Sequence, residues 1–441
     1  MQISSRMAQR TYSYALPQFV IALSTLALVN FAPSFYATEA GVSLGTLSLL
    51  LLVSRFSDVV TDPVIGWISD RTRTRWGRRK PIMAVGVPIF MGSVWMLFHP
   101  TEDAGALYFV VWYSMVFFGL TLIQLPYSAW GAEMTRDYNQ RTRIFSRREL
   151  VGSLGSITGI GVIIALALTG ETRLGPALHI IVVLLCIAAP VMIGLSFLTP
   201  ARLYAPTPDS RKPVRQSIFH NRSFIILLLA LVSVYMGITP GGAMVYFLFD
   251  DLLARPDLFG LNLLAQFVAG GIGVGLWSRL AQRIPKGRAV AWVLIWFAGF
   301  TALMPLAAAQ FGVWGVIGIA TVRSLALGAT LALPYSVFAD VVDVDTLATG
   351  RERTGQHIAV AGLTIKLAIT AGVSLSFAIP SWFGFEPGAP ANTELAEFSV
   401  KAVWSFLPGL LWLPAILLFW NFPIGPEDAA RTRAALEARR A

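Results

Sequence analysis

The chain has 441 residues, of which 55% are hydrophobic and 13% are charged, and its mean hydropathy is +0.65. A soluble protein of this length carries about 25% charged residues, so the composition excludes an ordinary water-soluble protein and indicates a surface that largely faces lipid. The net charge of +10 does not indicate nucleic acid as a partner, because the basic residues are grouped between long apolar stretches.

Twelve stretches are long and apolar enough to be membrane-spanning helices, each of which needs roughly 20 residues. The predicted fold is therefore all-α and polytopic, with twelve transmembrane helices; eleven or thirteen spans remain open alternatives. The stretches are 12–37, 43–69, 81–100, 105–130, 149–170, 177–199, 224–249, 258–280, 289–309, 312–338, 355–380 and 400–421.

The distribution of basic residues predicts the orientation of the chain. Most of the 34 Lys and Arg residues lie in the two tails and in alternate loops, while only Arg173, Arg255 and Lys401 fall on the other side. This asymmetry follows the positive-inside rule and predicts an inner-membrane protein with both termini in the cytoplasm. The first apolar stretch is too long for a removable signal peptide, and no small-residue cleavage site follows it, so we expect an uncleaved first span.

Two short matches show that the chain repeats itself. Residues 66–69 correspond to 275–278, and residues 125–128 correspond to 333–336, at nearly the same offset and at the same points of each half. Parallel repeats of this kind are the build of the major facilitator superfamily. The predicted parts are an N-terminal six-helix half (1–199), a cytoplasmic connector (200–222), a C-terminal six-helix half (223–421) and a cytoplasmic tail (422–441).

The second span carries two carboxylates on one helix face, because Asp58 and Asp62 are four residues apart. Two anions this close in a low dielectric need a proton or a bound cation, and Na⁺ prefers oxygen ligands, which Thr61 and the carbonyls freed by Pro63 could supply. The alternative is that Arg55 simply neutralises Asp58 one turn away. The first interpretation makes the pair a candidate site for a coupling ion, and the second makes it an internal ion pair.

Three further observations bear on charges within the spans. At the repeat offset, the acid pair corresponds to Phe267 and Gly271, so the carboxylates are not a feature that the fold requires twice. Lys366 is a lone cation in the eleventh span and needs an anionic partner, for which the acid pair is the natural candidate. Arg323 in the tenth span is either a strut of the bundle or a ligand.

Other side chains suggest a gate and exclude common cofactors. Asp70, Arg71 and Arg78 can form a charged latch on the cytoplasmic side, although a plain basic loop that sets topology explains the same residues. The single cysteine, Cys186, excludes an intramolecular disulfide, and the four histidines lack metal-ligand spacing. We expect no cofactor.

Three motifs resemble the glycoside–pentoside–hexuronide:cation symporter family. They are Ser54 to Pro63 continuing through Asp70 to Arg78, Pro126 to Ala129 with Tyr138 to Arg143, and Ala339 to Asp343 with Lys366 downstream. The resemblance runs through nearly the whole chain, and the second-span motif is its most specific part.

The resemblance implies a cation site and a link to it. In the family the second-span aspartates, matched by Asp58 and Asp62, bind Na⁺, Li⁺ or H⁺, a fourth-span threonine matched by Thr121 helps to ligate sodium, and the residue matched by Thr61 tunes the choice of cation. The eleventh-span lysine, matched by Lys366, is linked to that site. If the coupling ion is Na⁺, Asp58 and Asp62 are its carboxylate ligands.

The resemblance transfers less well to sugar recognition. The family positions whose aspartates hold sugar hydroxyls fall on Gln18 and Gln124, which can donate and accept hydrogen bonds but lack the charge of a carboxylate. Arg148 matches a sugar-contacting arginine, and Trp130 is a candidate stacking platform. The four are the candidate substrate residues.

The sequence therefore predicts a secondary transporter, not an enzyme, that couples a small-molecule solute to Na⁺ or H⁺ by alternating access and contacts membrane lipid. A sugar or glycoside is the first candidate solute, and a lysolipid or other amphiphile is the alternative. A passive facilitator and a polytopic membrane enzyme are the competing classes; an enzyme would be expected to carry a loop-borne acidic or His-rich cluster.

Overall fold

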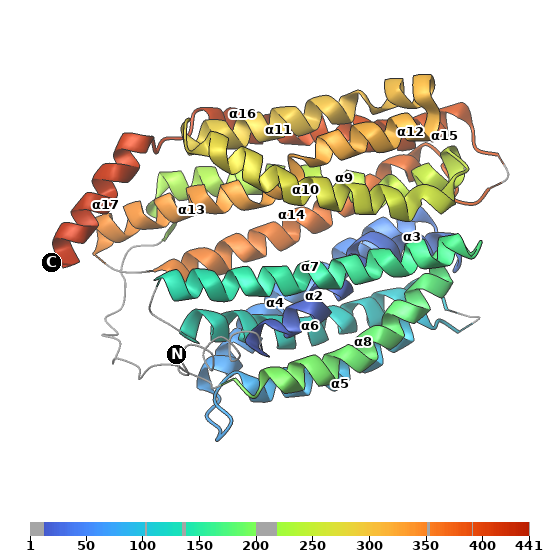
Figure 1. The fold of residues 1–441 in the computed structure, drawn as a ribbon. Coiled ribbons are helices and arrows are strands. Elements are labelled where there is room, and N and C mark those ends of the chain that lie inside the picture. Colours follow the sequence, from blue (N-terminus) through green and yellow to red (C-terminus); the bar gives the residue numbers. More distant parts are fainter. Residues whose placement is uncertain are drawn as a thin grey trace. The chain divides into compact units, whose positions relative to one another are not determined.

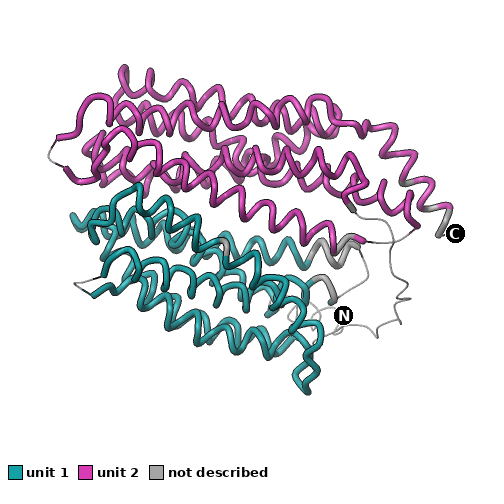
Figure 2. The backbone as a smooth tube through the Cα atoms, turned by 180° about the vertical axis from the view of Figure 1, so that it is seen from behind, with its two compact units in different colours: residues 1–210 teal, residues 211–441 magenta. Residues whose placement is uncertain are grey.

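The computed structural model describes residues 13–101, 104–134, 138–199, 218–350, 353–389 and 391–440. These residues form helices and connecting turns, and the only β-type pairing among them is an isolated bridge between Thr74 and Gly77. The chain separates into two compact units, 1–210 and 211–441 (Figure 2). The boundary falls inside the predicted connector 200–222, most of which lies outside the described residues.

Unit 1 contains six long helical runs (Figure 1). The first is interrupted by one π-helical segment, η1. The elements are α2 (Pro17–Thr25), η1 (Leu26–Phe31), α3 (Ala32–Thr38), α4 (Leu44–Arg71), α5 (Lys80–Phe98), α6 (Ala106–Met134), α7 (Tyr138–Leu168) and α8 (Leu174–Ser196).

Unit 2 has the same general build with more breaks. Its elements are η2 (Ile218–His220), α9 (Arg222–Phe247), η3 (Leu248–Leu252), η4 (Pro256–Leu258), α10 (Phe259–Ala281), α11 (Lys286–Ala302), α12 (Met304–Ser324), α13 (Leu327–Thr349), α14 (Thr354–Trp382), α15 (Glu394–Ser405), α16 (Leu407–Trp420) and α17 (Pro426–Arg440). The predicted tail contains α17, which packs against α13 (Figure 1).

Eleven helical stretches of the described residues are long and apolar enough to cross a membrane. The expected ninth span, 289–309, is the one that differs, because α11 has only 17 residues and the chain continues into α12. Gly312 adopts φ 57°, outside the helical region, and breaks α12 where the expected tenth span begins. The predicted all-α fold is confirmed.

Local sequence explains where several helices begin and how closely they pack. Ser43, Asn221 and Thr393 each cap a helix by accepting a hydrogen bond from a backbone N–H in its first turn. Gly119 of α6 lies against Phe90 of α5, and a Cβ at Gly119 would lie 2.8 Å from the Phe90 Cα atom. The absence of a side chain therefore lets the two backbones approach, as small residues do between membrane helices.

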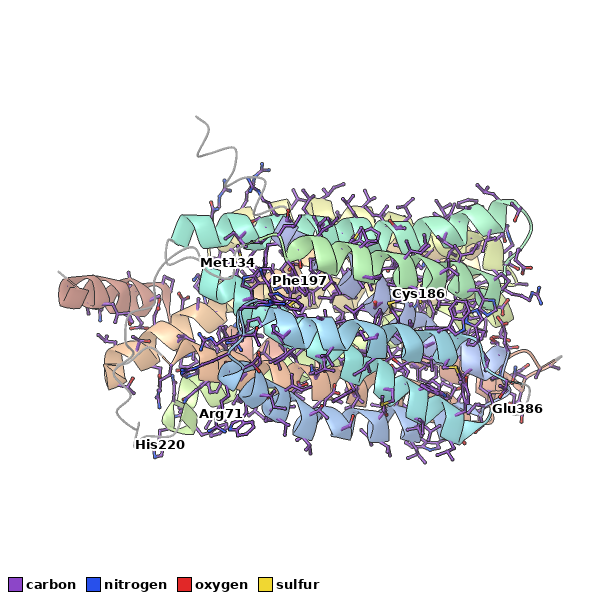
Figure 3. All side chains as sticks on the ribbon, turned by 90° about the horizontal axis from the view of Figure 1, so that it is seen from below. Arg71, Met134, Cys186, Phe197, His220 and Glu386 are labelled. Atoms are coloured by element: carbon purple, nitrogen blue, oxygen red, sulfur yellow. The ribbon has the colours of Figure 1, made fainter. Side chains whose placement is uncertain are left out.

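The ends of the even-numbered spans of unit 1 meet at the same end of that unit. Arg71, Met134 and Phe197, at the ends of α4, α6 and α8, all lie toward that end, whereas Cys186 lies farther along α8 (Figure 3). Lys80 at the start of α5 donates to the carbonyl oxygens of Phe197 and Thr199, at 2.8 and 2.7 Å. This up-and-down arrangement is the one that the alternating basic loops predict.

Candidate functional site

The acid pair of α4 lies inside unit 1 beside an arginine. Asp58 is 2% exposed and Asp62 is half-buried. The Arg55 Nη1 atom lies 3.2 Å from Asp58 Oδ2, and the Arg55 guanidinium lies 3.3 Å from the centre of the Phe117 ring on α6. The arginine is thus held between a carboxylate and an aromatic face. Both the neutralising role of Arg55 and a cation site at the pair are compatible with this geometry.

Two contacts fix the register of α4 against α6. Arg55 contacts Phe117, and a Cβ added at Gly66 would lie 3.7 Å from Leu125 Cδ2, so the two helices run in the same direction. On α6, Thr121 lies midway between these contacts and on the same face, since residues four apart share a face.

On α4, Asp58 and Asp62 fall between the same two contacts, on the stripe that joins Arg55 to Gly66. Thr121, which is 4% exposed, is therefore at the level of the acid pair.

Thr61 is the further predicted ligand on the helix that carries the acid pair. The Thr61 Oγ1 atom is buried and has no hydrogen-bond partner among the described residues. Among all described residues, there is no group of three or more His, Cys, Asp or Glu side chains that could hold a metal ion. Two carboxylates with hydroxyl and carbonyl oxygens fit Na⁺, Li⁺ or a proton, which need fewer charged ligands than a multivalent metal.

Lys366 belongs to unit 2, where it lies half-buried in α14. Its carbonyl oxygen accepts a hydrogen bond from Thr370 Oγ1 at 2.9 Å. The predicted link between Lys366 and the acid pair joins the two units and stays a prediction.

The predicted substrate residues of unit 1 divide into a buried cluster and one exposed side chain. Arg148 Nε donates to Gln18 Oε1 at 2.9 Å, and Gln18 is 9% exposed. Gly152 makes this approach possible, because a Cβ there would lie 2.8 Å from Gln18 Cγ. Gln124, in contrast, is exposed on α6. Gln18 therefore orients Arg148 in this structure, and Gln124 is the more exposed of the two amides.

Aromatic rings enclose this cluster. Tyr14 stacks on Tyr127 at 4.7 Å and meets Trp130 edge-on at 5.2 Å, and the Arg148 guanidinium lies 5.2 Å from the Tyr127 ring. Trp130 is only 1% exposed, so its face is covered by other side chains. Stacking of a solute on Trp130 would require those side chains to move. Tyr14 and Tyr127 were not among the predicted site residues, although Tyr127 lies in the Pro126 to Ala129 motif.

The predicted cytoplasmic gate contains an ion pair with a different arginine. Asp70 Oδ1 lies 2.7 Å from Arg79 Nη1, which also donates to Ser69 Oγ at 2.8 Å. Arg71 lies over the Trp67 ring at 3.9 Å. Arg79 is buried and ties the end of α4 to the start of α5. The sequence did not indicate this role, because Arg79 is one of several adjacent basic residues in the loop.

Arg323 in unit 2 is a buried cation without a carboxylate partner among the described residues. It is 4% exposed, and its Nη2 donates to Gln266 Oε1 at 2.6 Å, while Nε and Nη1 have no hydrogen-bond partner there. The rings of Phe297 and Trp404 lie 4.9 and 5.8 Å from the guanidinium. Each ring contributes about 0.5–2 kcal/mol, less than the several kcal/mol that burying an ion costs. The charge of Arg323 is thus only partly compensated.

The chain is similar in sequence to known membrane symporters. The inner membrane symporter YicJ of Escherichia coli (strain K12) is 24% identical over 396 residues, which cover 87% of this chain and 85% of the relative. The sodium-dependent lysophosphatidylcholine symporter 1 of Gallus gallus is 23% identical, with 88% of this chain and 81% of the relative covered.

Among solved structures, the crystal structure of a D-xylose-proton symporter superposes with a TM-score of 0.65 at 16% identity, covering 95% of this chain and 98% of the other. At this identity the likeness shows the shared fold, which is that of membrane transporters.

The match to the family described as MFS/sugar transport protein extends over almost the whole chain, from the first span to the beginning of α17. It includes every candidate site residue. The predicted major facilitator fold and the predicted family are confirmed. Because residues 13–426 match the family described as MFS/sugar transport protein, the chain belongs to that family of multi-pass membrane transporters.

Proposed function

We propose that this protein is a secondary active transporter that couples symport of a sugar or glycoside to Na⁺ or H⁺ by alternating access. The single observation that carries the proposal is the buried Asp58, paired with Arg55 and accompanied by Asp62 on the same face of α4. A charged group within a membrane span is costly, so its presence indicates a function. We further propose an inner-membrane location with both termini in the cytoplasm, on the asymmetry of the basic residues.

The charges of unit 1 suggest how one cation is coupled. Arg55 carries one positive charge against the two carboxylates of Asp58 and Asp62, which leaves one net negative charge when both are ionised. One Na⁺ or one proton neutralises that charge, with Thr61 and Thr121 as additional oxygen ligands. When the cation is absent, Lys366 is the counter-charge that we propose. Because Lys366 belongs to unit 2, its exchange for the cation would make the interaction between the units depend on whether the site is occupied.

The solute is proposed to contact Gln124 and Arg148, with Gln18 holding Arg148 in place. Arg148 is 14% exposed and carries five donors in a fixed fork, which suits hydroxyl-rich ligands. The family description, sugar transport, favours a sugar-like solute. The second candidate is an amphiphile such as a lysolipid, favoured by the similarity to a lysophosphatidylcholine symporter and by amides in place of carboxylates at positions 18 and 124.

A ligand screen on the purified chain tests the proposal. Melting temperature is measured with panels of sugars, glycosides and lysolipids, each with Na⁺ and with Na⁺ replaced by choline at two pH values, because a ligand stabilises the folded state by mass action. The hits are then assayed for uphill uptake into proteoliposomes under a Na⁺ or a proton gradient. Uphill uptake of a sugar with either gradient supports the proposal; uptake that equilibrates but never accumulates identifies a passive facilitator and refutes it.

A further inference from the structure

A second polar site lies inside unit 2, away from the acid pair of α4, and it is built around Arg323. The side chains of Arg323, Asn262, Gln266 and Ser324 are at most 9% exposed. Gln266 Oε1 accepts from Arg323 Nη2 at 2.6 Å and from Ser324 Oγ at 3.1 Å, which joins α10 to α12. The acceptor capacity of that oxygen is thereby used, and the rest of the guanidinium points elsewhere.

Buried polar atoms of the described residues that have no hydrogen-bond partner lie around this network. Arg323 Nε and Nη1 have no partner in the described part of the chain, and neither has either amide atom of Asn262, which is fully buried. Asn262 lies one turn before Gln266 on the same face of α10. The indole N–H of Trp404, whose ring lies 5.8 Å from the guanidinium, is also without a partner there. Buried polar groups are normally satisfied, so this concentration points to a bound species.

The chemistry of the site identifies that species as an anion. A guanidinium stays charged in proteins, so Arg323 cannot escape its burial by losing a proton. No carboxylate of the described residues forms an ion pair with it. Water could take up the unused hydrogen bonds but would leave the charge uncompensated. A Cβ added at Gly241 of α9 would lie 3.5 Å from Nη1, which is an ordinary contact distance. Because Gly241 has no side chain, the space beside Nη1 is free for an atom of that size.

We propose that Arg323, Asn262 and Gly241 form a binding site for a small inorganic anion, of which chloride is the abundant example. One monovalent anion matches the single charge of Arg323 and accepts from Nη1 and the Asn262 amide N–H. A carboxylate carried by the solute has the same chemistry, but it would have to reach a cluster enclosed by α9, α10, α12 and α15. The burial of the site therefore favours a resident ion that stabilises the bundle. The site is independent of the solute and of the coupling cation.

Melting temperature of the purified full-length chain tests the site when chloride replaces methanesulfonate at constant Na⁺ and ionic strength. We expect a rise of about 1–2 °C for each tenfold increase in chloride beyond half-saturation. Arg323→Gln abolishes the response. The matched control Arg288→Gln, an exposed arginine of the same unit whose guanidinium lies 5.9 Å from a tryptophan ring, keeps it.

Asn262→Ala keeps the guanidinium and provides a second test where Arg323→Gln does not fold. It is expected to raise the half-saturating chloride concentration by about tenfold, as loss of one buried hydrogen-bond partner does. Equal melting temperatures of the wild-type protein in chloride and methanesulfonate overturn the proposal. So does a chloride response that survives both substitutions, or a shift that glucuronate produces and chloride does not, which would assign Arg323 to a carboxylate on the solute. Because Na⁺ is constant, failure here leaves the cation coupling untouched.

Discussion

The Nη1 atom of Arg55 lies 3.2 Å from Oδ2 of Asp58, one turn away on the face of α4 that also carries Asp62. Because Asp58 is almost fully buried, this pair couples the stability of unit 1 to the charge state of its candidate cation site. Removing a carboxylate therefore has different consequences from removing the arginine.

Replacement of Asp58 or Asp62 with Asn removes a charged ligand while keeping the side-chain shape. We expect Asp58→Asn and Asp62→Asn each to abolish cation-driven accumulation in proteoliposomes, while downhill exchange survives, since solute binding and coupling are separable free energies. The control is Asp257→Asn, an exposed carboxylate paired with Arg255. Unaltered uphill uptake in both variants would refute the assignment of the cation site.

Replacement of Arg55 with Gln removes the ion pair between Arg55 and the buried Asp58 carboxylate. Breaking a buried pair from one side costs about 3–5 kcal/mol, so the melting temperature of Arg55→Gln should fall markedly. The double variant Arg55→Gln/Asp58→Asn should recover much of that loss. Thermal unfolding of the two single variants and the double variant measures the coupling energy. Additive losses would mean that the pair contributes nothing specific.

Gln124 is the exposed amide of the candidate substrate region. We expect Gln124→Ala to weaken binding of a polyhydroxylated solute by about tenfold or more, because a polar partner of the solute is lost. Gln282→Ala, an exposed amide at the end of α10, is the control. Solute-dependent melting temperatures give the affinities. An amphiphilic solute predicts instead that Gln124→Ala is nearly silent.

Gly119 tests the close packing of α5 against α6. A Cβ at this position would lie 2.8 Å from the backbone of Phe90, so Gly119→Ala should destabilise the protein by about 1–3 kcal/mol through overpacking. Gly92→Ala in the neighbouring helix is the matched control, since its Cβ would meet nothing within 4 Å, and it should be neutral or stabilising by about 0.5–1 kcal/mol. Equal melting temperatures of the two variants would contradict the packing described for α5 and α6.

The orientation of the chain is tested by a reporter fused after Ala441. The distribution of basic residues predicts cytoplasmic reporter activity at that point. Periplasmic activity would reverse the predicted topology, and with it the side on which the Asp70–Arg79 pair lies.

The features that the sequence determined by itself are those with a local physical cause. Apolar length defines most of the spans, basic loops predict the orientation, and the spacing of Asp58 and Asp62 places both on one face because a helix repeats every 3.6 residues. The repeat of 66–69 at 275–278 indicated two halves without any structure.

Only the tertiary structure decided which distant side chains meet. Gln18 pairs with Arg148 across 130 positions, Asp70 forms an ion pair with Arg79, and Arg323 is enclosed with Gln266. Such pairs depend on where glycines let helices approach and where they end, as at the break at Gly312. The periodicity of apolar residues within one helix does not show which other helix it contacts, because the contacting faces are far apart along the chain.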